Sequence, residues 1–103
     1  MLIGEAMEIA MNSRGIPVVK VNYEDLGNWA WKKGKKPHLH IHLFGRVENA
    51  VKQVFPETIY LPARESGFYD GFVALDKDDI AEIQKQIAVL ENTDKYDLKN
   101  WGL

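Results

Sequence analysis

The sequence PHLHIHLFGR, residues 37–46, decides how the middle of this chain folds. It contains all three histidines of the protein, His38, His40 and His42, and an apolar residue follows each one. Side chains of a β-strand alternate between its faces, so the histidines leave one face and the intervening apolar residues leave the other. On an α-helix the same histidines would spread over about 400° of rotation. The spacing therefore predicts a strand that carries a row of imidazoles, each about 6.6 Å from the next.

A row of histidines on one face is unusual enough to indicate chemistry. A buried imidazole needs a partner for both ring nitrogens, so three of them are costly without a purpose. Histidine also titrates close to neutral pH, which suits a nucleophile, a general acid or base, or a metal ligand. The plain alternative is three exposed histidines on an ordinary strand. We disfavour it because the chain has no other histidine.

The composition is that of an ordinary globular domain. The 103 residues fit a single domain over 1–103, with 46% hydrophobic and 27% charged residues. A net charge of −2 gives no general attraction to nucleic acid or to an anionic membrane. No apolar run approaches the roughly 20 residues of a membrane span, and no secretory signal opens the chain. With no cysteine, we expect a cytoplasmic protein without a nucleic-acid or membrane partner.

Periodicity predicts the elements around the histidine strand. Residues 2–14 have the apolar spacing of an amphipathic helix, and residues 17–23 alternate like a strand. A long polar connection then leads to the strand at 37–44, which indicates an antiparallel hairpin. Asp76 is a suitable N-cap for a second helix at 76–91. We therefore predict an α+β fold, an antiparallel sheet packed by an N-terminal and a C-terminal helix.

Other segments give weaker expectations. In the first strand, Val19, Val21 and Tyr23 should share one face. Residues 58–61 suggest a short strand. The tail, residues 92–103, contains Tyr96, Leu98 and Trp101, which we expect to dock on the body. Several aromatic residues could stack a nucleobase or close the core, and we favour the core: Trp29, Trp31, Phe68, Tyr69 and Phe72.

Two kinds of chemistry suit the histidine row. Two of the histidines could bind zinc together with a distant acid such as Asp25 or Asp70, although no spacing points to either acid. Alternatively, a neutral imidazole could attack phosphorus and form a covalent phospho-histidine. His40 is flanked by a histidine on each side, so it is the natural nucleophile of the second scheme.

The motif HLHIHLF at residues 38–44 resembles the His-φ-His-φ-His-φ-φ signature (φ, apolar) of the histidine triad (HIT) superfamily of nucleotide hydrolases and transferases. Pro37 before it and Gly45-Arg46 after it fit the same pattern, as does the strand at 18–22. The resemblance covers about residues 1–46. It implies hydrolysis of a nucleoside phosphoramidate or a dinucleoside polyphosphate, or nucleotidyl transfer, through a covalent nucleotidyl-histidine intermediate, with no cofactor and no structural metal.

The resemblance also implies roles for individual residues. His40 would be the nucleophile at the α-phosphorus, His42 would contact the phosphate, and His38 would orient the site through hydrogen bonds. Asn22 would contact the phosphate or the ribose. Arg46, just after the motif, could reach an anionic substrate or pair with a surface acid.

Two features depart from the family pattern. Where members have a glycine-rich turn with a hydroxyl group near the leaving group, this chain has WKKGKK at 31–36. Lys35 and Lys36 could bind extra phosphates there, or the loop could simply be solvated. Members also have strands before the long helix. Here we expect that a partner subunit or residues 47–75 replace them, or that the chain is truncated.

From these observations we expect a HIT-like nucleotide phosphohydrolase or nucleotidyl transferase that forms a homodimer with joined sheets and acts on a small nucleotide. Two alternatives stay open. One is a nucleotide-binding or interaction module with weak or no catalysis. The other is a metal-dependent hydrolase that uses two of the histidines.

Overall fold

The computed structural model describes residues 1–25, 31–36 and 40–102. Two helices and one antiparallel strand pair make up its regular structure, which confirms the expected small α+β fold. Short 3₁₀ turns accompany them. In chain order the elements are α1 (Leu2–Ser13), β1 (Val18–Asp25), β2 (Ile41–Val47), η2 (Arg64–Ser66), α2 (Lys77–Glu91), η3 (Asp94–Tyr96) and η4 (Leu98–Trp101).

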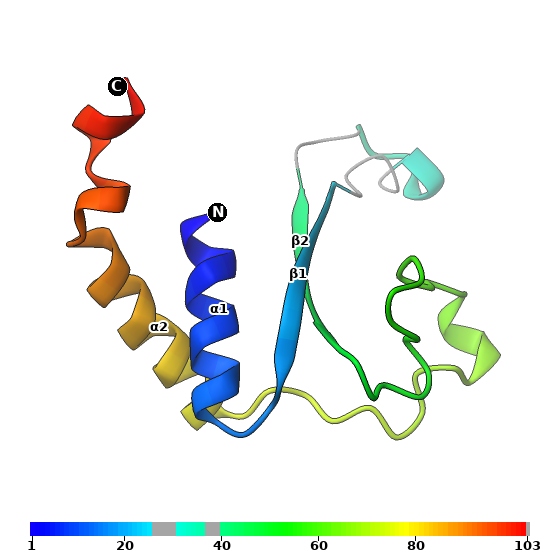
Figure 1. The fold of residues 1–103 in the computed structure, drawn as a ribbon. Coiled ribbons are helices and arrows are strands. Elements are labelled where there is room, and N and C mark those ends of the chain that lie inside the picture. Colours follow the sequence, from blue (N-terminus) through cyan, green and yellow to red (C-terminus); the bar gives the residue numbers. More distant parts are fainter. Residues whose placement is uncertain (26–30, 37–39, 103) are drawn as a thin grey trace.

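The elements form layers, with α1 packed between α2 and the two-stranded sheet (Figure 1). The segment 48–75 runs along the far side of the sheet before the chain returns to α2. The radius of gyration is 16.0 Å, against about 13 Å for a compact domain of this length. The arrangement is therefore open, and the face of the sheet that points away from α1 is only partly covered.

The core lies between α1 and the sheet. Ala10 and Met11 of α1 are buried against Val18 and Val21 of β1, and Leu43 of β2 packs against this group. Leu43 thus forms part of the apolar underside predicted for the histidine strand. Burial of these side chains fixes which face of β2 points toward α1, and so which face is left for the histidines.

The first strand departs from strict alternation. Its register shifts between Val18 and Lys20, as a β-bulge does. Val18 and Val21 are buried, while Val19 is 44% exposed. The prediction that Val19 shares a face with Val21 was wrong, because the extra residue of a bulge reverses the alternation on one side of it.

The strand expected at residues 58–61 was also wrong. Gln53 satisfies the backbone of this segment in place of a neighbouring strand. The Tyr60 N–H donates to Gln53 Oε1 at 2.9 Å, and Gln53 Nε2 donates to the Tyr60 carbonyl at 2.7 Å. Because the side-chain amide pairs with both backbone groups of this residue, these groups are not available for hydrogen bonds to a neighbouring strand.

The second helix begins as predicted, with Asp76 as its N-cap in a reciprocal capping box with Asp79. Arg14, at the end of α1, donates from Nε to Asp79 Oδ1 at 2.9 Å. This hydrogen bond, helped by the one from the Asp76 backbone, holds the pKa of the Asp79 carboxyl below its usual value. The same carboxylate therefore starts α2 and ties it to α1.

We expect Asp79→Asn to lower the melting temperature at pH 7 and to reduce the loss of stability in acid. A carboxyl whose pKa falls on folding stabilises the folded state above its unfolded pKa of about 3.9, and this stabilisation disappears as the pH drops through the folded-state pKa. Thermal melts between pH 2.5 and 7 should show the two proteins converging below about pH 4. Asp78→Asn, in the same helical turn, is the matched control. Equal acid sensitivity of Asp79→Asn and the wild type would contradict the assignment.

The C-terminal tail docks on α1 mainly through polar groups. Lys95 Nζ donates to Glu5 Oε2 at 2.8 Å, and the Tyr96 hydroxyl donates to the same oxygen. The Trp101 ring stacks on Tyr96, whereas Leu98 stays 64% exposed. Docking on the body is confirmed for Tyr96, whereas the contacts given for Trp101 are to Tyr96 and Lys95 of the tail itself, and the prediction was wrong for Leu98. Among the described residues, no helix has the length and apolar character needed to cross a membrane.

Candidate functional site

The two described histidines lie side by side on the face of the sheet that points away from α1. The rings of His40 and His42 stack with centroids 4.5 Å apart and planes 13° from parallel. His40 is exposed and His42 is half-buried. Their expected placement on one face is confirmed. His38, the third member of the row, lies outside the described residues.

Neighbouring groups hold this pair of rings in place. Phe44 stacks on the other side of His42, with centroids 5.7 Å apart and planes 9° from parallel, so three rings continue along one face of β2. The backbone N–H of His40 donates to Asp25 Oδ1 at 3.2 Å, which fastens the start of β2 to the end of β1. Stacked rings on a paired strand cannot rotate independently without losing contact, so the two imidazole edges are presented together.

Arg46 lies further along the same face and is almost entirely buried, at 3% exposure. Its Nη1 donates to Asn22 Oδ1 at 2.7 Å, and its Nη2 donates to the carbonyls of Val54 and Glu57 at 3.0 and 2.7 Å. The guanidinium also lies over the Phe55 ring. The alternative that Arg46 pairs with a surface acid was therefore wrong. It fastens the segment 54–57 over one end of the face, which leaves the histidine end open.

Asn22, expected to contact the phosphate or ribose, is brought to this face opposite Phe44. Its side-chain oxygen is taken by Arg46. Hydrogen bonding to the oxygen of an amide leaves its NH₂ group as the available donor. Asn22 can therefore serve a ligand as a hydrogen-bond donor, one step along the sheet from His42.

Glu24 is a candidate site residue that the sequence reasoning missed. The strand register pairs it directly with His42, and side chains so paired have Cβ atoms about 4.5–5.5 Å apart. The side chain of Glu24 forms no ion pair or hydrogen bond with another described residue. Only the register between β1 and β2 identifies Glu24, and this register depends on the bulge at Val18–Lys20.

The segment 31–36, which contains Lys35 and Lys36, lies beyond the end of the sheet at which β2 begins (Figure 1). Gly34 makes the turn there with a positive φ of 71°, and its N–H donates to the Trp31 carbonyl at 3.0 Å. Lys35 and Lys36 are exposed. Lys36 and His40 are four positions apart in the chain, so their Cα atoms are at most about 14 Å apart. The turn can therefore place positive charge near the imidazoles.

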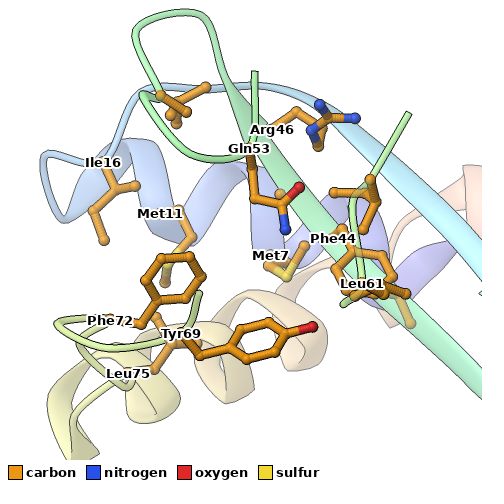
Figure 2. Close-up of a pocket in the computed structure, with 15 residues that line it drawn as sticks. Met7, Met11, Ile16, Phe44, Arg46, Gln53, Leu61, Tyr69, Phe72 and Leu75 are labelled. Carbon is orange, nitrogen blue, oxygen red and sulfur yellow. The ribbon is translucent and has the colours of Figure 1, made fainter. Parts of the chain in front are cut away.

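Two cavities flank β2. The larger, about 440 Å³, follows the strand and opens between α1 and the segment 50–75 (Figure 2). Phe72 points across it toward Met11, whereas Tyr69 points toward Leu61 and donates from its hydroxyl to the Pro62 carbonyl at 2.9 Å. Phe68, Tyr69 and Phe72 also meet one another edge to face. These three aromatic residues pack against one another outside the buried core, and Phe72 is 50% exposed. Trp31 is 74% exposed, and Trp29 lies outside the described residues.

The smaller cavity, about 280 Å³, is polar, and its lining includes Arg46 but neither His40 nor His42. Asn22, Glu24 and Arg46 contribute from the sheet, and residues 56–59 close it from above. Within the described ranges 1–25, 31–36 and 40–102, no group of three or more histidine, aspartate or glutamate side chains is placed to hold a metal ion.

Comparisons with protein-family models, with curated proteins and with solved structures give no match for this chain. The site must therefore be interpreted from its own geometry.

Proposed function

We propose that this protein is a nucleotide phosphohydrolase or nucleotidyl transferase of the HIT type, with His40 as the nucleophile. The observation that carries the proposal is the parallel pair of His40 and His42 rings at 4.5 Å on an open face of the sheet. Substrates would be dinucleoside polyphosphates or nucleoside phosphoramidates. The assignment to the HIT superfamily rests on the motif at residues 38–44.

The reaction would proceed in two displacements at the α-phosphorus. A ring nitrogen of neutral His40 gives its lone pair to phosphorus, and the bond from phosphorus to the leaving group breaks with its electron pair. Water, or an acceptor alcohol in transfer, then attacks the phosphorus and breaks the P–N bond to His40. The edge of His42 lies beside the same phosphate and can donate a hydrogen bond to its oxygens as negative charge develops.

The lysines of segment 31–36 affect which leaving group the site favours. No hydroxyl side chain occurs in the segment 31–36, whereas an amine leaving group needs a proton in order to depart. A polyphosphate leaves as a stable anion, and the charges of Lys35 and Lys36 would stabilise it. Of the two substrate types, the turn therefore favours dinucleoside polyphosphates.

The test is to detect the covalent intermediate. Purified protein is mixed briefly with a dinucleoside polyphosphate or an adenosine phosphoramidate, with and without a chelator, and intact-mass spectrometry is followed by peptide mapping. We expect one nucleotidyl group per chain on His40 and turnover that the chelator does not change. Loss of turnover with chelator would replace the proposal with a metal-dependent hydrolase. Nucleotide binding without adduct or turnover would replace it with a binding module.

We also propose that the protein is a homodimer with joined sheets. A two-stranded sheet is marginal by itself, and β2 makes its described ladder bonds to β1 only. The larger cavity runs along that strand and leaves apolar side chains such as Phe72 half exposed. Light scattering coupled to size-exclusion chromatography should give twice the chain mass of 11.8 kDa. A monomer mass at micromolar concentration would contradict the proposal.

A further inference from the structure

Segment 31–36, with the sequence WKKGKK, is an exposed patch that combines one aromatic ring with four positive charges. All six residues are exposed, and Trp31 is 74% exposed. The side chains of Lys33, Lys35 and Lys36 form no ion pair or hydrogen bond with another described residue. The proposed function uses Lys35 and Lys36 and gives no role to Trp31 or Lys33. The patch is therefore larger than the proposed site requires.

A tight turn holds these side chains together. The N–H of Gly34 donates to the Trp31 carbonyl at 3.0 Å, and Gly34 has a positive φ of 71°, which favours glycine. In such a turn the first and fourth Cα atoms lie within about 7 Å of each other. The segment lies beyond the end of the sheet at which β2 begins (Figure 1). Trp31 and the lysines are thus presented together on an exposed turn.

The charge of this patch is opposite in sign to that of the rest of the chain. Its lysines contribute +4 to a net charge of −2, so the other residues together carry −6. The nearest acids in the sequence, Glu24 and Asp25, offset at most half of the local charge. At physiological ionic strength, exposed charges more than about 8 Å apart are largely screened from each other. A surface that touches only the turn therefore meets positive charge, although the net charge gave no reason to expect a membrane partner.

The residue types favour an anionic membrane over a nucleic acid as the partner. Tryptophan is enriched at membrane interfaces, where its ring is buried and its N–H stays hydrated. Lysine ammonium groups act as point charges on flexible stems, which suits the diffuse negative charge of anionic lipids. Sites for single-stranded nucleic acid instead combine a groove with several aromatic residues and arginine, and this segment has one aromatic residue and no arginine. Ile41, the first residue of β2, adds a 55% exposed apolar side chain at the same end of the sheet.

We infer that segment 31–36 docks on membranes that contain anionic lipids, with its lysines among the headgroups and Trp31 in the interface. Each lysine near such a surface raises the binding constant about fivefold, so the four together raise it by about 10²–10³-fold. The inference goes beyond the proposed function and does not depend on it, because Trp31 and Lys33 lie outside the proposed catalytic groups.

Cosedimentation of the full chain with lipid vesicles tests the inference. Vesicles of phosphatidylcholine mixed with phosphatidylserine should bind the protein, pure phosphatidylcholine vesicles should not, and added salt should weaken the binding. Lys33→Gln should lower the affinity about fivefold. Trp31→Ala should lower it about tenfold or more, because the interface no longer removes the apolar surface of an indole ring from water.

Two variants are matched controls and should bind like the wild type. Lys77→Gln removes an exposed lysine at the start of α2, and Trp101→Ala removes a ring that is 50% exposed on the tail. No binding to the anionic vesicles, equal binding to both kinds of vesicle, or unchanged affinity in both Trp31→Ala and Lys33→Gln would overturn the inference. Tighter binding to a single-stranded RNA than to the anionic vesicles, weakened in the same two variants, would overturn it in favour of a nucleic-acid interface.

Discussion

Replacing His40 with asparagine should abolish the covalent intermediate and lower kcat/KM by about 10³-fold or more. Asparagine keeps a polar group on the strand but has no basic nitrogen lone pair, so no bond to phosphorus can form. Removing a group that acts in the transition state lowers kcat, whereas KM changes little if substrate contacts persist. Initial rates with a dinucleoside polyphosphate and intact-mass spectrometry measure both effects.

Comparing His42→Asn with His40→Asn distinguishes the role of the nucleophile from that of the neighbouring histidine. Loss of one donor that stabilises developing charge costs about 10²–10³-fold in kcat, so His42→Asn should be slower than the wild type but should still form the adduct on His40. Either change removes the stack between His40 and His42, and His42→Asn also removes the stack on Phe44. An adduct that persists in His40→Asn, or that disappears only in His42→Asn, would contradict the assignment of the nucleophile.

Arg46→Met should destabilise the fold by about 2–4 kcal/mol. The guanidinium donates three hydrogen bonds that hold Asn22 and the segment 54–57 over the sheet, and hydrogen bonds to charged groups contribute about 1.5–3 kcal/mol each without adding fully. For a domain of this size, 1 kcal/mol corresponds to about 4–8 °C in melting temperature. Calorimetric melts at pH 7 should therefore show a fall of roughly 10–25 °C.

Two further variants test whether the loss of stability in Arg46→Met comes from its hydrogen bonds. Arg64→Met changes an exposed arginine and should leave the melting temperature within about 2 °C of the wild type, since substitutions at such positions have small effects. Arg46→Lys keeps the charge but cannot make several hydrogen bonds in one plane, so its stability should lie between those of Arg46→Met and the wild type. Equal melting temperatures for Arg46→Met and Arg64→Met would show that the buried network contributes nothing.

Local sequence patterns predicted the elements of this fold well. The helix at Leu2–Ser13 follows from apolar spacing, and the one at Lys77–Glu91 follows from Asp76 and the stripe behind it. Alternation within the histidine strand placed His40 and His42 on one face. Each of these predictions depends on residues close together in the chain. Within a helix or a strand, the spacing of such residues decides which of them lie on the same face.

The sequence by itself thus determined the α+β elements and the imidazole row, because helix and strand periods are properties of short segments. Only the tertiary structure decided what surrounds the row. The bulge at Val18–Lys20 sets the register that brings Glu24 opposite His42, and burial turns Arg46 from a surface cation into the support of segment 54–57. These outcomes depend on packing between residues 8 or more positions apart and in different segments, which periodicity within a segment does not encode.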